Sequence, residues 1–350
     1  MAYTTIDDSS LYFRVKTYSG SSSDGNAVTW DETHANMQPD WLWLKNRTDA
    51  QEHWLADVVR GTGKFLESNS DNAESSDGAS GLASFDTNGF TLNNSARTNR
   101  NTMVGWGWKA GGTASSNTDG SITSSVSANT TAGFSIVSFT GTGSNATVGH
   151  GLGTAPSMVI IKRRDSANDW RTGSDALTNW TKHINLNTTA AESDLAVAFN
   201  STAPTSSVFS VGTSPSTNAS SGTFIAYCFT STKGYSKIGS YTGNGNADGT
   251  FIYLGFRPAW IMFKRTDSSV DWTIYDNKRL GYNENNYKLR PNLSNAEYST
   301  SGYFEADILS NGFKIRTSDA EVNTSGGTYM YLAFAEAPFV NSNGVPNNAR

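Results

Sequence analysis

The four histidines are the first candidates for metal binding or proton transfer: His34, His53, His150 and His183. Their intervals match no metal-ligand spacing, in which paired ligands usually stand about two to five residues apart. A neutral imidazole is also a common hydrogen-bonding group with no catalytic role. We therefore expect each histidine to be solvent-exposed or locally hydrogen-bonded, and we predict no metal site.

Two loops match known ligand-binding motifs only in part. Residues 141–153 are rich in glycine but lack the Gly-Lys-Ser/Thr ending of a phosphate loop and a helix to follow it. Residues 244–249 read Asn-Gly-Asn-Ala-Asp-Gly, the first half of a calcium loop, yet the twelfth position is Gly255, which offers no carboxylate. We expect turn glycines in the first loop and a hairpin turn in the second, and we predict no cofactor.

Paired carboxylates could cleave a glycosidic bond, one as the acid and the other as base or nucleophile. Glu305 and Asp307 stand two residues apart, which puts them on one face if the segment is a strand. No comparable pair recurs in the internal repeats described below. We interpret both as surface acids and predict that the protein has no catalytic residues.

The composition favours folded strands and argues against several partners. Charged residues make up 16% of the chain and aromatic residues 12%, with ten tryptophans, so there is apolar surface enough for ordered cores. The net charge of −5 provides no basic field for a phosphate backbone, so we expect no nucleic-acid partner. Cys228 is the single cysteine, and we expect it in a buried strand. We also expect a soluble chain with no secretion signal and no membrane insertion.

One pattern occurs three times along the chain and indicates internal repeats. Residues 39–45, 156–162 and 258–264 each read proline, one variable residue, four apolar residues and lysine. A run of four apolar residues behind a proline predicts a buried strand entered from a turn. The recurring positions are Pro39, Pro156 and Pro258, and Lys45, Lys162 and Lys264.

Three further positions recur after this block. A tryptophan follows an aspartate by five residues, which predicts a hairpin whose second strand carries Trp54, Trp170 or Trp272 as a packing residue. Asparagine and glutamate then recur at a constant interval, and repetition of the glutamate indicates a folding role, such as bonding to turn amides or to the recurring lysine. These positions are Asn69, Asn187 and Asn292, and Glu74, Glu192 and Glu297.

The repeats divide the chain into five parts. Copy one covers residues 1–112 with a short N-terminal arm, copy two 134–233 and copy three 234–340. Residues 113–133 are mostly Ser, Thr, Asn, Gly and Ala and predict an extended linker, on which copy one could hinge. Residues 341–350 form a polar tail.

Short strands and frequent turn residues predict an all-β protein of three tandem antiparallel β-sandwiches, of jelly-roll or concanavalin-like type. Helix should be minor. Residues 50–60 and 276–282 are the best helical candidates, although a strand is at least as consistent with each. Trp30, Trp41 and Trp180 do not recur and could form exposed platforms for sugar rings.

The pattern resembles a repeat of virion and tail-fibre-like proteins of marine tailed bacteriophages. The matching phrases are residues 38–47, 148–162, 235–245 and 331–339, so the resemblance extends over nearly the whole chain. It implies a sandwich fold, no catalytic residues, and a place on the particle surface for a protein made in the host cytoplasm. Copy two departs from the pattern where the other copies have Asn-Gly-Phe.

These observations lead to one main hypothesis and two alternatives. The main one is a structural protein of a phage virion, a fibre or appendage subunit or a capsid decoration protein, whose partners are other capsid or tail proteins. Three copies in one chain could also imitate a trimer or join a threefold set. The alternatives are an adhesin that binds host surface glycan and, with less support, a polysaccharide-degrading enzyme.

Overall fold

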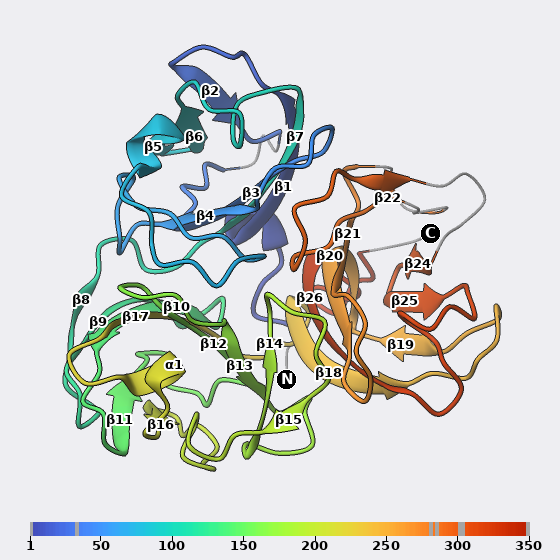
Figure 1. Cartoon of the computed structure of the whole chain (residues 1–350). Coiled ribbons are helices and arrows are strands. Elements are labelled where there is room, and N and C mark those ends of the chain that lie inside the picture. The colour runs from blue at the N-terminus through green and yellow to red at the C-terminus, as the bar shows by residue number, and fades with distance from the viewer. Residues whose placement is uncertain (1–2, 32–34, 280–282, 284–286, 300–304, 348–350) are drawn as a thin grey trace.

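The structure, a computed structural model, describes residues 3–31, 35–279, 283, 287–299 and 305–347. In these ranges the fold is built almost entirely from antiparallel strands, which confirms the predicted all-β class. The helical elements described are short: η1 (Ser9–Leu11), η2 (Gly78–Ser80) and α1 (Pro215–Asn218). Figure 1 shows three β-rich lobes arranged around a common centre.

Each copy of the sequence pattern forms a main sheet that contains four equivalent strands in the same order. Copy one contributes β1 (Phe13–Ser19), β7 (Thr102–Trp108), β3 (Trp41–Asn46) and β4 (Trp54–Asp57). Copy two contributes β10 (Phe134–Thr140), β17 (Thr223–Phe229), β12 (Met158–Arg163) and β13 (Arg171–Ser174). Copy three contributes β18 (Ser236–Thr242), β26 (Thr328–Pro338), β20 (Phe256–Arg265) and β21 (Thr273–Asp276).

The strand register also repeats. Trp41 pairs with Trp108, Met158 with Phe229, and Trp260 with Phe334, at the same place in each sheet. Pro39 and Pro156 precede their strands as predicted, whereas Pro258 lies inside β20 at a bulge, where a residue without an amide hydrogen is tolerated.

A smaller sheet covers one face of each main sheet. In copy one it consists of β2 (Asn26–Thr29), β6 (Gly89–Leu92) and β5 (Leu82–Asp86). In copy two it consists of β11 (Ala146–Gly149) and β16 (Val208–Val211). In copy three it consists of β19 (Phe251–Tyr253), β25 (Gly312–Ile315) and β24 (Ala306–Leu309).

The predicted linker is wrong. Residues 113–133 contain β8 (Ser115–Asn117) and β9 (Ser124–Asn129), and β9 pairs with β10 along six residue pairs, so this segment extends the main sheet of copy two. Ser124, Val126 and Ser127 are buried. Hydroxyl-rich residues suit the two outermost strands of a sheet, here β9 and the edge strand β8, as well as a flexible linker, because each hydroxyl can bond to the backbone or to water.

Four short strands complete the fold. They are β14 (Lys182–Asn185), β15 (Ser193–Asp194), β22 (Tyr287–Lys288) and β23 (Tyr298–Ser299). Of the two helical candidates, residues 50–60 contain strand β4 instead, and β21 ends at Asp276 before a turn over residues 277–279. Residues 280–282 lie outside the described part of the chain.

Both faces of each main sheet are buried, which explains the continuous apolar runs in the repeated block. In β3 every residue is buried: Leu42 and Leu44 face the small sheet of copy one, whereas Trp41 and Trp43 face the centre of the molecule. The central cluster contains residues from all three copies, so the sheets pack on one another as well as on their own small sheets.

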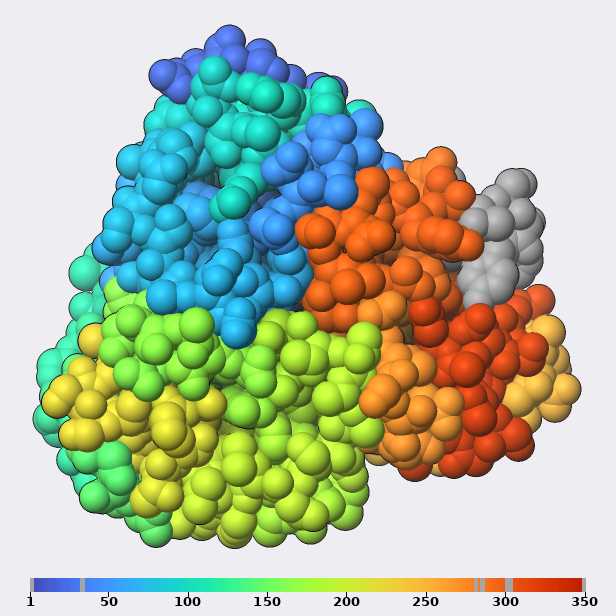
Figure 2. Space-filling model, viewed as in Figure 1, coloured from blue at the N-terminus to red at the C-terminus, as the bar shows by residue number. Residues whose placement is uncertain are grey.

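Aromatic rings dominate this central core. Trp41 of copy one stacks on Tyr227 of copy two with centroids 4.4 Å apart, and Trp108 meets Trp260 of copy three edge to face at 5.6 Å. Phe229 and Phe334 link copies two and three at 6.0 Å. The suggestion that copy one hinges against the rest is therefore wrong, since its sheet shares one core with the other two. Figure 2 shows the three lobes in contact along their borders.

Candidate functional site

The recurring lysines join the copies to one another. Lys45, Lys162 and Lys264 are fully buried, and each ammonium donates one hydrogen bond to the carbonyl of the next residue and one to a carbonyl in a neighbouring copy. The neighbouring carbonyls belong, in that order, to Ser294 (3.1 Å), Asp71 (3.1 Å) and Thr189 (3.2 Å). Burial lowers the pKa of each lysine to about 8.

These contacts close a ring. The lysine of copy one bonds to copy three, the lysine of copy three bonds to copy two, and the lysine of copy two bonds to copy one. The backbone amides of the recurring glutamates add a second set between the same pairs of copies: the amide of Glu74 bonds to Arg164 O at 2.7 Å, that of Glu192 to Thr266 O at 2.8 Å, and that of Glu297 to Arg47 O at 2.8 Å. Each border between two copies, which we call a seam, therefore carries the same two hydrogen bonds to backbone carbonyls, one from a lysine ammonium and one from a glutamate amide.

The recurring asparagines fix the hairpin that follows each lysine. The side-chain oxygens of Asn69, Asn187 and Asn292 accept a hydrogen bond from a backbone amide at 2.9–3.0 Å. The amides belong to His53, Trp170 and Trp272. Trp54 is therefore not the counterpart of the other two tryptophans, and the predicted alignment of copy one is wrong by one residue.

His53 takes the place of tryptophan at the seam. Its Nε2 lies 3.0 Å from Arg290 O of copy three, just as the indole nitrogens of Trp170 and Trp272 donate to Glu67 O and Asn185 O, both at 2.9 Å, in their neighbouring copies. Trp54, one residue later, points to the opposite face of the strand and packs on Phe65 inside copy one.

Two of the three seams also contain a buried ion network. In copy one, the Arg60 guanidinium contacts the Asp57 carboxylate at 2.6 Å and Glu74 at 3.3 Å, and both side chains of the closer pair are fully buried. Copy two completes the network: Arg164 binds Glu74 at 2.8 Å, and the Tyr227 hydroxyl donates to Asp57 at 2.8 Å. Burial opposes the charge on Arg60, but the Asp57 carboxylate raises its pKa above the ordinary value.

The seam between copies three and one repeats this arrangement. Arg279 contacts Asp276 at 2.7 Å and Glu297 at 2.9 Å within copy three. From copy one, Arg47 binds Glu297 at 2.8 Å and Trp106 Nε1 donates to Asp276 at 3.0 Å. The glutamate has the predicted structural role. At these two seams its side chain binds arginines rather than turn amides or the recurring lysine, whereas Glu192 of copy two accepts a hydrogen bond from the Thr178 amide, as predicted.

The third seam keeps the glutamate but has uncharged residues at the other positions of the network. Ser174, Leu177 and Thr266 stand at the positions of Asp57, Arg60 and Arg164, and Leu332 stands at that of Tyr227. The carboxylate of Glu192 instead accepts bonds from Thr178 within its own copy. The buried aspartate and the two arginines are thus present together or absent together, as expected if a single buried charge is costly without its partners, whereas the half-buried glutamate is kept at all three seams.

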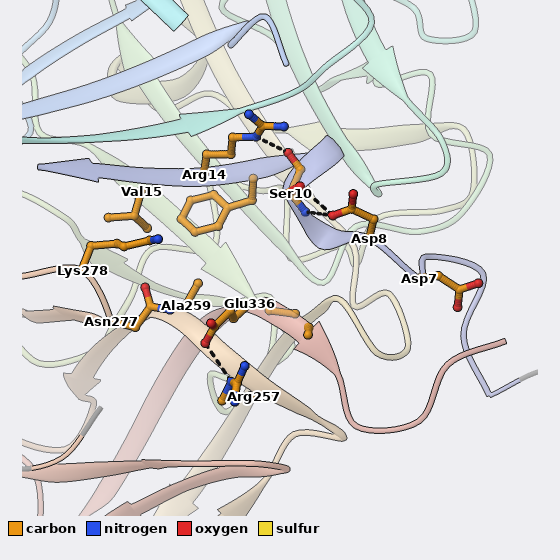
Figure 3. Close-up of a pocket in the computed structure, with 13 residues that line it drawn as sticks. Asp7, Asp8, Ser10, Arg14, Val15, Arg257, Ala259, Asn277, Lys278 and Glu336 are labelled. Atoms are coloured by element: carbon orange, nitrogen blue, oxygen red, sulfur yellow. Dashed lines mark hydrogen bonds and ion pairs between the residues drawn. The ribbon is translucent and has the colours of Figure 1, made fainter. Parts of the chain in front are cut away.

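A cleft of about 490 Å³ opens where copy three meets the N-terminal segment of copy one. Figure 3 shows Arg14 of β1 on one side and Arg257, Glu336 and Lys278 on the other, with the Arg257 guanidinium paired to Glu336 at 2.8 Å. A cleft of about 610 Å³ lies at the seam between copies one and two. There, Val58 and Val59 occupy the positions of Asn277 and Lys278. The two clefts therefore lie at equivalent places in the ring but present different side chains to a ligand.

The histidines in the described ranges are buried and hydrogen-bonded. The Nδ1 atom of His53 accepts from Trp43 Nε1 at 2.8 Å, and burial lowers the pKa of this imidazole well below its ordinary value. His150 contacts Thr205 O at 3.1 Å, and His183 contacts Arg171 at 2.8 Å. His34 lies outside the described residues. Of the two alternatives predicted for these three histidines, hydrogen bonding is confirmed and solvent exposure is wrong.

The calcium-like loop is a connection between sheets rather than the predicted hairpin, since β18 and β19 belong to different sheets. The Asp248 carboxylate lies 2.5 Å from the Lys314 ammonium, which gives this acid a cation from the chain itself. The loop is organised by Asn323, whose Nδ2 donates to Asn246 O at 2.7 Å and whose Oδ1 accepts from the Asn244 amide at 2.9 Å.

This loop-binding asparagine is a further recurring position, which the sequence reasoning missed. Asn99 and Asn218 make the corresponding bonds to Ser23 O at 2.7 Å and Ser144 O at 2.6 Å. In residues 141–153, Gly143, Gly151 and Gly153 have a positive φ, as predicted for turn glycines, whereas residues 146–149 form strand β11. The interval from the asparagine to the next strand is three residues in copy one and five in the other copies, which hid the match.

The acid pair does not assemble. Glu305 is fully buried, with its carboxylate 2.7 Å from the Lys288 ammonium and 2.6 Å from the Tyr275 hydroxyl, so its interpretation as a surface acid is wrong. Asp307 instead binds Arg316 at 3.2 Å. Glu305 does lie near Asp319 and Glu321, but Lys288 and Arg290 each bind Glu321 at 2.6 Å, so the chain itself supplies cations to this group.

The predicted sugar platforms are also wrong. Trp30, Trp41 and Trp180 are 4%, 2% and 7% exposed, and all three belong to hydrophobic clusters. Cys228 is fully buried in β17, as predicted, and burial raises the pKa of its thiol to about 12. Among the residues that the structure describes, no helix has the length and apolar character needed to span a membrane.

Comparison with protein families places the ring in context. The profile of a family described as a domain of unknown function (DUF7483) matches residues 8–338, a span that includes all three copies. The chain belongs to this family. The DUF7483 match thus treats the complete ring as one unit, in agreement with the shared central core. No curated protein and no solved structure matches the chain.

Proposed function

We propose that this DUF7483 protein is a non-enzymatic structural component of a bacteriophage particle, exposed at the surface as a fibre or appendage subunit or as a capsid decoration protein. The observation that carries the proposal is the closed ring. Its recurring lysines, glutamates and asparagines serve to join the copies or to fix their hairpins, which is the use expected in a rigid building block. The resemblance to virion and tail-fibre-like repeats supports the same assignment.

The ring also suggests how such a protein would attach. Three similar sheets around one centre give a single chain the outline of a trimer, and an assembly site with threefold symmetry offers three matching surfaces to it. The seams differ, however, because one lacks the ion network. Attachment at a threefold site would therefore use the similar outer surfaces and not the seams.

Mass spectrometry and electron microscopy of purified phage particles test this proposal. We expect the chain among the particle proteins, at a stoichiometry that fits one ring for each attachment site, and density with three lobes at the particle surface. Absence of the chain from purified particles, with the protein present only in the infected-cell lysate, would contradict the proposal.

A further inference from the structure

Copy three carries two exposed aromatic rings on the outside of its small sheet. Phe251 is 44% and Tyr253 is 47% exposed, although both are large and partly apolar. They stand two residues apart on β19 and so share one face, while Ile252 between them is 6% exposed and faces the core. Two residues of a strand span about 6.8 Å, so the rings form one continuous surface.

The fold does not require aromatic residues at these positions. Strand pairing aligns Ile252 with Val28 of copy one and Val148 of copy two, since these three residues pair with Phe313, Phe90 and Phe209. The flanking residues are then Ala27 and Thr29 in copy one, and Thr147 and Gly149 in copy two. The equivalent strands of copies one and two thus have small residues at these positions, and the aromatic pair is specific to copy three.

The Tyr253 ring makes polar contacts with its neighbours. The Tyr253 hydroxyl lies 2.9 Å from the hydroxyl of Tyr3, and the Lys237 ammonium donates to the Tyr253 carbonyl at 2.6 Å. Lys237 also lies 5.8 Å from the centre of the Tyr253 ring. Ordered rings lose less conformational entropy on binding than mobile ones.

Charged side chains that neutralise one another border the rings at the other end. Lys314 is the cross-strand partner of Phe251 and pairs with Asp248, while Arg316 pairs with Asp307 at 3.2 Å. The border therefore offers hydrogen-bond donors and acceptors without a large net charge. Two half-exposed rings contribute far less than the area of about 800 Å² per partner that a stable protein interface buries, and lysine and aspartate are depleted from such interfaces.

A pyranose ring matches this surface better than a protein does, because its C–H face is apolar and its edge carries hydroxyls. We propose that the outer face of β19, defined by Phe251 and Tyr253 and bordered by Lys314 and Asp307, binds neutral hexose units of a polysaccharide. The sugar faces lie on the two rings, and the hydroxyls bond to the bordering charged groups. This site is independent of the proposed structural role and would give a surface protein a means to hold a glycan.

Affinity electrophoresis of the full chain tests the site, with native gels that contain a soluble glucan, mannan or galactan as the probe. The test variant is Phe251→Thr with Tyr253→Thr, which gives β19 the residue types found in copies one and two and preserves strand propensity. Val197→Thr removes another apolar residue, 44% exposed in copy two, and serves as the matched control.

We expect at least one polysaccharide to retard the native protein and the Val197→Thr variant equally, and the double variant roughly tenfold less. Unchanged melting of the double variant shows that it is folded. If the double variant melts at a lower temperature than the native protein, the single variant Phe251→Thr is used instead, because Phe251 takes no part in the hydroxyl contact with Tyr3.

Three results would overturn the proposal. The first is a native protein that none of the three polysaccharides retards, and the second is equal retardation of the native protein and the aromatic variants. The third is concentration-dependent dimerisation of the native protein, abolished in the double variant and accompanied by no glycan binding. That result would assign the face to self-association.

Discussion

At the scale of single residues, the buried charges of the seams form an interdependent set. Asp57, Arg60 and Tyr227 contact one another at the seam between copies one and two. Asp276 binds Arg279 and Trp106 at the seam between copies three and one. The third seam has Ser174, Leu177 and Leu332 at these positions instead. Removing one member of a buried pair leaves an uncompensated charge, whereas replacing all of them by uncharged groups of suitable shape is often neutral. The chain thus contains both solutions to the same packing problem.

This comparison predicts a sharp contrast between variants. Arg60→Leu alone should lower the free energy of unfolding by about 3–5 kcal/mol, because the Asp57 carboxylate then remains buried without its cation. Adding Asp57→Ser and Tyr227→Leu, the residues of the third seam, should recover most of the loss. Urea denaturation of both variants measures the difference. A triple variant less stable than Arg60→Leu would contradict the interdependence of the set.

The buried lysines predict how stability depends on pH. Their pKa of about 8 in the folded chain lies below the value of about 10.4 in the unfolded chain, so the unfolded state binds more protons between these values and stability rises with pH over that window. Burial raises the pKa of Tyr227 and Tyr275, so the unfolded state ionises first and stability falls above about pH 10.

Urea midpoints measured at pH 7, 9 and 11 should therefore be highest at pH 9. Lys162→Met, which removes one of the titrating groups, should reduce the rise between pH 7 and pH 9 while leaving the fall above pH 10. A midpoint that declines steadily from pH 7 would show that the lysines keep their ordinary pKa in the folded protein.

At the scale of elements, some features could be predicted from sequence and others could not. The apolar block before Lys45, Lys162 and Lys264 predicted a buried strand in each copy because the pattern is short and has constant spacing. The next strand of copy one was misaligned because Asp49 stands one residue further from its lysine than Asp165 does. Counting from the lysine gives eight residues to His53 and eight to Trp170.

The strand β9 shows a different limit. Its sequence is rich in serine and gives only weak alternation, so composition alone favoured a linker over a strand. Replacing residues 115–129 by a Gly/Ser segment of equal length should lower the melting temperature by several degrees, because the six residue pairs with β10 are removed. For a chain of this size that unfolds as one unit, each kcal/mol lost corresponds to about 1–2 °C. An unchanged melting temperature would restore the linker interpretation.

At the scale of the whole molecule, the contacts between copies could not be predicted from the repeat. A repeated pattern fixes which residues are equivalent, but it does not say whether the copies form a string or a ring. The ring depends on Lys45 bonding to Ser294, which lies 249 residues later in the chain, and on Trp41, Trp108 and Trp260 sharing one core. The prediction of three tandem sandwich domains stays a prediction, and the shared core argues for a single cooperative unit.

Differential scanning calorimetry of the full chain tests this central claim most directly. Because the three copies share one core and a closed set of contacts, we predict one unfolding transition whose calorimetric and van't Hoff enthalpies agree. Two or three resolved transitions, or a calorimetric enthalpy about three times the van't Hoff value, would mean that the copies unfold separately and would contradict the ring as the unit of structure.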